Sequence, residues 1–254
     1  MKFIDLDRRY RFRFFSKTYI FPVLLSNCID EWGNSFGKNG NHPMVCALNA
    51  SSERSERMQY LKEWYTRPEN QIRSYNDISG RSIDDEIGKM YFCPWEHDRA
   101  RPLEKFLKSH KVGPTKNEKL ISIVKRLEST LSSILKVGYD YRYNLDNVIQ
   151  VIKLIGNDQH EKYIIRDGQH RASVLSHLDY KEIPVCYVSD YHEPSKLFRF
   201  AHLLFRKRPF INKNNESIVN VENVKLWPHV VTGNTTAREA LNHFNSVFNK
   251  STIN

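Results

Sequence analysis

The chain carries the run Tyr163-Ile164-Ile165-Arg166-Asp167-Gly168-Gln169-His170-Arg171-Ala172. Its apolar first half predicts a short strand, and Asp167-Gly168 predicts a tight turn that opens a helix. The first turn of a helix has backbone N–H groups without partners inside the helix, and it carries the positive end of the helix dipole. A glycine that lets the backbone come close and a neighbouring cation complete a typical phosphate site. The run therefore predicts an anionic ligand, and Asp167 suits metal binding or removal of a proton from a hydroxyl.

The flanking segments predict a mixed α+β fold. Thr115 and Glu118 fit a capping box, and Gly138 fits the glycine that follows a helix. Between them runs one apolar helical stripe, formed by Leu120, Val124, Leu127, Leu131 and Ile134. Residues 148–155 and 162–166 predict a β-hairpin, the helix after Gly168 reaches residue 178, and residues 183–188 predict a third strand. The order helix, hairpin, helix, strand gathers the functional loops around one strand end.

We divide the chain into an N-terminal extension (1–105), a core (106–190) and a helical C-terminal segment (191–254). The extension either completes the core sheet or builds a substrate pocket. Within it, basic and aromatic residues alternate at 9–14, which predicts a half-buried strand. Further predictions are loops from about 27 to 49, helices at 51–67, 195–208 and 235–248, a connector with Trp95 packed on the core, and an anchored turn at Trp227.

Composition limits the class of protein. The 254 residues are 40% hydrophobic with a formal net charge of +10, which favours an anionic partner: a nucleotide, nucleic acid, an acidic glycan or a membrane surface. Cys28, Cys46, Cys93 and Cys186 have neither disulfide-framework nor zinc-ligand spacing. The apolar runs are too short to span a bilayer and the N-terminus is unlike a signal peptide, so we expect a cytoplasmic protein.

The motif Asp167-Gly168-Gln169-His170-Arg171-Ala172, followed by Ile183-Pro184-Val185, resembles the ParB/sulfiredoxin superfamily over residues 106–190. That resemblance implies a small α+β nucleotide-binding core in which the helix start holds phosphates. Sulfiredoxins carry a catalytic cysteine where this chain has Gln169, so the resemblance does not extend to sulfinic acid reduction. ParB proteins carry a different box and a helix-turn-helix domain that residues 190–254 do not suggest.

The free-serine-kinase branch is the most similar. Its DGHHR box matches Asp167, Gly168, His170 and Arg171, and its catalytic glutamate falls near Glu118. Gln169 departs from the box and leaves the substrate open. The tail, with Trp227-Pro228-His229-Val230 and Glu239-Ala240-Leu241, is weakly similar to ParB-like proteins of bacterial surface-polysaccharide loci.

These likenesses imply roles for each residue. Gly168, Gln169, His170 and Arg171 would bind the nucleotide phosphates, and His170 would also be a catalytic residue. Asp167 would act as general base or as a Mg²⁺ ligand. Glu118 is either a catalytic partner or only a helix cap. Thr115 and Lys116 either contact the nucleotide or form a cap with a solvated lysine.

The sequence therefore predicts an ATP- and Mg²⁺-dependent kinase that acts on the hydroxyl of a small metabolite or a sugar or glycan unit. Surface-polysaccharide biosynthesis is the expected setting. The alternative is a ParB-like DNA-binding protein switched by CTP or ATP, which the positive charge favours. Peripheral contact with a membrane also stays open.

Overall fold

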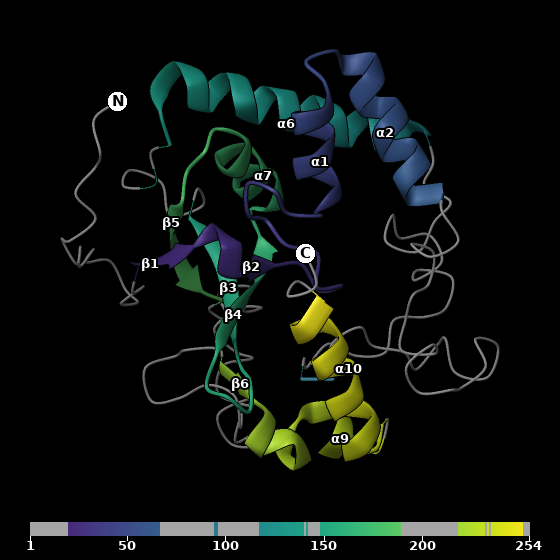
Figure 1. Cartoon of the computed structure of the whole chain (residues 1–254), viewed down its shortest axis with the longest axis vertical. Coiled ribbons are helices and arrows are strands. Elements are labelled where there is room, and N and C mark those ends of the chain that lie inside the picture. Colours follow the sequence, from purple (N-terminus) through teal and green to yellow (C-terminus); the bar gives the residue numbers. More distant parts are fainter. Residues whose placement is uncertain are drawn as a thin grey trace, which may run out of the picture.

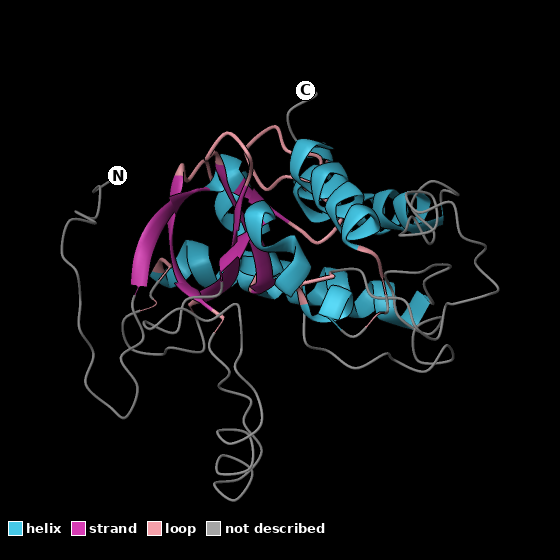
Figure 2. Ribbon diagram, turned by 90° about the horizontal axis from the view of Figure 1, so that it is seen from below, coloured by secondary structure: helices cyan, strands magenta, loops and turns pink. Residues whose placement is uncertain are grey.

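The computed structural model describes residues 20–66, 94–95, 117–139, 141, 148–188, 218–231, 233 and 235–250. The strand predicted at 9–14 and the basic helix predicted at 195–208 lie outside these ranges, as do Cys93, Thr115 and Lys116. The fold class is α+β, as the sequence predicts, with helices packed beside a mixed sheet (Figures 1 and 2). Within the described ranges, no helix is long and apolar enough to cross a membrane.

The sheet is built around a β-hairpin in the predicted place. Strands β3 (Ile149–Ile155) and β4 (Glu161–Asp167) pair antiparallel across the tight turn between them. Strand β5 (Glu182–Tyr187) runs parallel to the first half of β3, and β6 (Ile218–Asn220) runs parallel to its second half. Both therefore occupy the same edge of β3.

The N-terminal segment supplies the strands at either side. Strand β1 (Ile20–Leu24) pairs antiparallel with β5, and β2 (Cys28–Ile29) pairs parallel with β4, which gives the order β1-β5-β3-β4-β2. A 3-10 turn (Leu25–Asn27) joins β1 to β2. Of the described residues before 105, the two strands within 20–29 therefore share one sheet with the hairpin.

The loop predicted from about 27 to 49 is only partly a loop. Helix α1 (Pro43–Ala50) occupies its end, with His42 as N-cap accepting a hydrogen bond from the Met44 amide. A proline in the first turn suits a helix start, because its fixed φ is helical and its missing N–H would have no partner there. The prediction of a loop was wrong after Pro43, because only residues 33–41 have the Gly- and Asn-rich composition of a loop.

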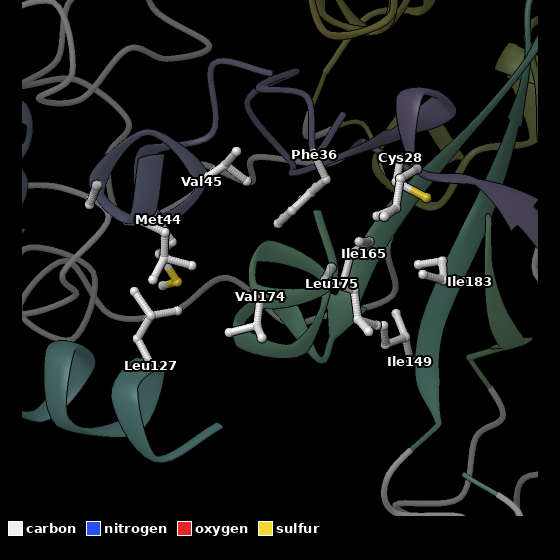
Figure 3. Packing of buried hydrophobic residues seen from close by; sticks show 14 of the residues in the cluster. Cys28, Phe36, Met44, Val45, Leu127, Ile149, Ile165, Val174, Leu175 and Ile183 are labelled. Carbon is white, nitrogen blue, oxygen red and sulfur yellow. The ribbon is translucent and has the colours of Figure 1, made fainter. Parts of the chain in front are cut away.

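Two hydrophobic clusters cover opposite faces of the sheet. Val151 and Ile165 belong to the first cluster, whereas their neighbours Ile152 and Ile164 belong to the second, as the alternation of a strand requires. The first cluster holds α1, α2 (Arg54–Thr66), α6 (Asn117–Val137) and α7 (Gln169–His177). Figure 3 shows Ile149, Ile165, Leu175 and Ile183 packed at its centre. The apolar stripe predicted for α6 is the face that this helix turns toward the cluster. Leu131 is partly buried, and Leu120, Val124, Leu127 and Ile134 are buried.

The second cluster belongs to the C-terminal segment. Trp95 and Trp227 meet edge to face at 5.4 Å and both contact Phe244, which confirms that Trp95 packs on the core. The chain enters this cluster through a 3-10 helix (Val221–Leu226) and α9 (Pro228–Val231), and ends in α10 (Ala237–Asn249). Thr236 and Glu239 form a capping box at the start of α10, the yellow helix of Figure 1.

Candidate functional site

A β-bulge sets the direction of Asp167. In the β3–β4 ladder Gln150 pairs with Asp167 but Val151 pairs with Ile165, so Arg166 is an extra residue on β4. An extra residue shifts the alternation of side chains, and bulges of this kind often re-aim a side chain at a functional site. Asp167 therefore faces the same side of the sheet as its partner Gln150, rather than the side occupied by Ile165.

The next strand extends this row. Gln150 also pairs with Cys186 of β5, so Asp167, Gln150 and Cys186 are neighbours across three adjacent strands. Cys186 is buried, and this burial raises the pKa of its thiol to about 11 despite the opposing charge of Arg171. The thiol is therefore neutral at physiological pH. We call Asp167, Gln150 and Cys186 the polar row.

Gly168 connects the polar row to α7 in a conformation that suits glycine. Its φ of +93° is left-handed, and it is the N-cap of α7. A Cβ on Gly168 would lie 2.8 Å from Ile149 Cγ1 and 3.3 Å from the guanidinium nitrogens Nε and Nη2 of Arg171. The backbone of Gly168 is thus packed closely against Ile149 of the core and against the Arg171 side chain, and a side chain at position 168 would not fit.

Arg171 folds back over this glycine onto Asp167. Its Nη2 donates to Asp167 Oδ2 at 2.9 Å, and the exposed fractions of the two side chains are 16% and 55%. An ion pair with one partner this exposed contributes at most about 1 kcal/mol to stability. An incoming phosphate at the helix start can therefore draw the guanidinium away from Asp167 at small cost.

The side chain of Gln169 bonds the backbone of the turn. Its side-chain amide donates to the carbonyl of Ile165 at 3.3 Å, next to the bulge, and its own carbonyl accepts from Ser173 Oγ at 2.9 Å. His170 lies half-buried in the same first turn of α7. The run Asp167 to Arg171 is thus assembled as the sequence predicts, except that Gln169 bonds the backbone.

Glu118 is not part of this assembly. It is exposed in the first turn of α6, and roughly 28 Å of helix separates it from Val137 at 1.5 Å per residue. The far end of α6 is the one near the polar row, because Tyr139 lies within electrostatic reach of Arg171 and its hydroxyl bonds the backbone of Ile149. An acidic side chain in the first turn stabilises the helix dipole, and that accounts for Glu118.

Two aromatic side chains from the segment after α6 lie beside the polar row. Tyr139 and Tyr141 follow the end of α6 and lie 5.9 Å apart, and Tyr141 packs with Cys186. Burial raises the pKa of Tyr139, so its phenol stays protonated. Sequence reasoning missed Gln150, Cys186 and Tyr139. Gln150 carried the one available signal, since it is a polar residue inside the apolar run 148–152.

A second polar cluster lies under α7. Buried His42 has Nδ1 3.4 Å from Ser173 Oγ, and its Nε2 lies 3.9 Å from Asp30 Oδ2. Asp30 itself accepts from the Trp32 and Asn34 amides and from the Asn34 side chain, which places its carboxylate in a tight loop. The arrangement has the order of a Ser-His-Asp triad.

This cluster is explained by structure rather than by catalysis. Ser173 has no exposed surface and donates to the Gln169 carbonyl, and His42 Nδ1 already accepts from the Met44 amide. Lys250 of the C-terminal segment donates to the Trp32 carbonyl and to Asn34 Oδ1. The cluster therefore joins residues 30–42, α7 and the end of α10.

Burial of His42 predicts sensitivity to acid. Burial lowers the pKa of His42 to about 3, so the folded state keeps it neutral while the unfolded chain takes up a proton near its ordinary pKa of 6.5. The resulting stability is present above pH 6.5 and is lost as the pH falls toward 3. We expect His42→Asn, which keeps an N-cap acceptor but does not titrate, to reduce the slope of unfolding free energy by about 1.4 kcal/mol per pH unit.

Urea unfolding of wild type and variant between pH 6 and pH 4 measures this slope. His160→Asn is the matched control, because His160 is 78% exposed in the hairpin turn. Asp30, whose pKa burial raises, contributes a slope of the opposite sign and is present in all three proteins. Equal slopes for His42→Asn and wild type would show that His42 does not titrate with folding.

Comparison of the chain with models of protein families, with curated proteins and with solved structures found no match. Among the described residues, no three His, Cys, Asp or Glu side chains gather closely enough to hold a metal ion. The site is therefore interpreted from its own geometry: a carboxylate and a guanidinium at a glycine-started helix, beside a row of polar side chains.

Proposed function

We propose that the chain is an ATP-dependent phosphotransferase acting on the hydroxyl of a small metabolite or a sugar or glycan unit. The observation that carries the proposal is the 2.9 Å contact between Asp167 and Arg171 across Gly168 at the start of α7. A base and a phosphate-binding cation are thereby held side by side. Phosphoryl transfer requires this, because its catalysis rests on positioning and on charge neutralisation.

In this mechanism the N–H groups at the start of α7 and the Arg171 guanidinium hold the terminal phosphates, and His170 lies in the same helical turn. Arg171 leaves Asp167 as it turns to the phosphate, which frees the carboxylate to act as base. The acceptor hydroxyl passes its proton to Asp167, and its oxygen forms the new bond to the γ-phosphorus. The bond from that phosphorus to the β–γ bridging oxygen breaks, and ADP leaves with the electron pair.

A magnesium ion arriving with the nucleotide fits this site. Mg²⁺ prefers oxygen ligands and keeps several waters, so one carboxylate together with phosphate oxygens is a usual protein contribution. In the alternative role that the sequence leaves open, Asp167, which is more than half exposed at the strand end, would hold this ion instead of acting as the base. The ion would neutralise charge on the phosphates.

The order of elements also supports a ParB/sulfiredoxin-like core. Helix α6, the β3–β4 hairpin, α7 and β5 follow one another as that resemblance implies, with the glycine-started helix directly after β4. Within the superfamily, Gln169 in place of cysteine and the DGxHR pattern favour the kinase branch. A role in surface-polysaccharide biosynthesis rests only on the weak likeness of the tail.

A two-step experiment tests the proposal. The purified chain is first titrated with ATP, ADP, CTP and GTP in the presence of Mg²⁺ by isothermal calorimetry. The nucleotide that binds most tightly is then labelled on its γ-phosphate and offered with a panel of amino-alcohol, polyol and sugar acceptors. Transfer of label to an acceptor supports the kinase, whereas binding without transfer to any acceptor counts against it.

Replacing Arg171 by alanine should weaken nucleotide binding. A hydrogen bond to a charged group contributes about 1.5–3 kcal/mol, so the dissociation constant should rise by about 10- to 150-fold. Arg54→Ala is the control, because Arg54 carries the same charge and an ion pair, with Glu128, on a different surface. Equal affinities for these two variants would indicate that Arg171 does not contact the phosphates.

The DNA-binding alternative rests on the net charge of +10. A protein that binds DNA through phosphate contacts loses affinity steeply as salt is raised. Fluorescence anisotropy with a labelled duplex, titrated at several salt concentrations with and without CTP, separates this function from the kinase. Tight, salt-sensitive and nucleotide-dependent binding would favour the alternative.

A further inference from the structure

Gln150 occupies the central position of the polar row. It pairs with Asp167 on one side and with Cys186 on the other, and it is half-buried. Opposed residues of an antiparallel pair have Cβ atoms about 5 Å apart, so the Gln150 amide and the Asp167 carboxylate can contact one small molecule together. The amide of Gln169, in contrast, is bonded to the Ile165 carbonyl.

We propose that Gln150 binds the acceptor beside Asp167 and selects acceptors that carry a second hydroxyl next to the reacting one. This inference rests on the proposed kinase function. A primary amide offers both hydrogen-bond donors and an acceptor, so it can pair with a hydroxyl in either sense. The reacting hydroxyl contacts Asp167 and its neighbour contacts Gln150.

The surroundings of Gln150 favour a neutral polyol over a cationic acceptor. The Cys186 thiol next to it is neutral, and the nearby phenol of Tyr139 stays protonated. An ammonium group at this point would lie beside Gln150 without a carboxylate of its own, since Asp167 is engaged with the reacting hydroxyl. A vicinal diol satisfies the amide without burying a charge.

The test compares matched acceptors in the full chain. Wild-type protein is assayed for transfer of γ-labelled phosphate to propane-1,2-diol and propane-1,3-diol, and to the best sugar acceptor and its derivative lacking the adjacent hydroxyl. We expect wild type to prefer the vicinal member by about tenfold in kcat/KM, the effect of about 1.4 kcal/mol. Gln150→Leu, which keeps the volume but loses the amide, should remove that preference by raising the KM for the vicinal member, while the KM for ATP stays unchanged.

Two further variants make the result specific. Gln150→Asn keeps an amide and should retain part of the preference, whereas Gln59→Leu makes the same substitution on the exposed surface of α2 and should retain all of it. A preference that survives in Gln150→Leu would overturn the role of Gln150 while leaving the kinase intact. Nucleotide binding without transfer by the wild-type protein would instead remove the kinase, and the role of Gln150 with it.

Discussion

Asp167→Asn is expected to lower kcat by about 10²- to 10⁴-fold, the usual contribution of a general base. Asparagine has the shape of aspartate and still offers an oxygen to Arg171, so the turn before α7 should be preserved. It cannot accept the proton of the acceptor hydroxyl. The affinity for nucleotide should therefore remain close to that of wild type while turnover is lost. Initial rates of ADP release at saturating ATP and acceptor measure kcat, and calorimetry measures the affinity for nucleotide.

The control for this variant lies on the same hairpin. Asp158→Asn changes the same functional group in the turn between β3 and β4, at the opposite end of the strands from Asp167, where Asp158 accepts from the His160 amide. Asparagine can make that bond as well, so turnover should be unaffected. If Asp167→Asn turned over like wild type, Asp167 would only cap the turn before α7, and the proposed mechanism would lose its base.

The parts of the site that are local in sequence were predictable. The Asp-Gly pair after an apolar run places the turn, and the following His170 and Arg171 place the helix, because these features depend on neighbours within a few residues. The hairpin follows from two β-branched runs around a short turn. The helix after it and the strand at 182–187 follow from periodicity in the same way.

The direction of Asp167 was not predictable. Strict alternation along β4 would place Asp167 on the same face as Tyr163 and Ile165, with the core of α6 and α7. The bulge changes that face, and it is set by the pairing of two strands rather than by the residues of either one. Gln150 was missed for the same reason, since only the register makes it a neighbour of Asp167.

Contacts between residues far apart in the sequence explain why the second polar cluster was also missed by sequence reasoning. Asp30, His42 and Ser173 come from separate parts of the chain, so their proximity left no local pattern to read. For Glu118 the sequence left a catalytic role and a helix cap open, and the length of α6 favours the cap because it separates Glu118 from the end of the helix near the polar row. Among the described residues, the geometry thus keeps Asp167–Arg171 together as the candidate site and adds Gln150 and Cys186 of the polar row, while Thr115 and Lys116 lie outside the described ranges.

Gly168→Ala is expected to destabilise the protein and to weaken nucleotide binding in one change. Alanine at a φ of +93° costs about 1–2 kcal/mol of backbone strain. Its Cβ would also lie 2.8 Å from Ile149 Cγ1, inside the packed core, and such crowding typically adds about 1–3 kcal/mol. The Cβ would also lie 3.3 Å from the guanidinium nitrogens of Arg171, so the guanidinium would have to shift slightly at the helix start where we propose that phosphate binds.

Gly138→Ala separates the two contributions. Gly138 follows α6 at a φ of +79°, but a Cβ there would have no atom within 4 Å, so only the backbone strain of about 1–2 kcal/mol applies. Urea unfolding of both variants gives the stability difference, and calorimetry with ATP gives the binding difference. If Gly168→Ala and Gly138→Ala lost equal stability and kept their nucleotide affinity, then Ile149 and Arg171 would have shifted to accommodate the extra methyl group. A greater loss of stability for Gly168→Ala, together with weaker nucleotide binding, would show that position 168 needs glycine for two reasons: the space beside Ile149 and Arg171, and the backbone conformation. The proposed site has both needs, because its backbone contacts the phosphates directly.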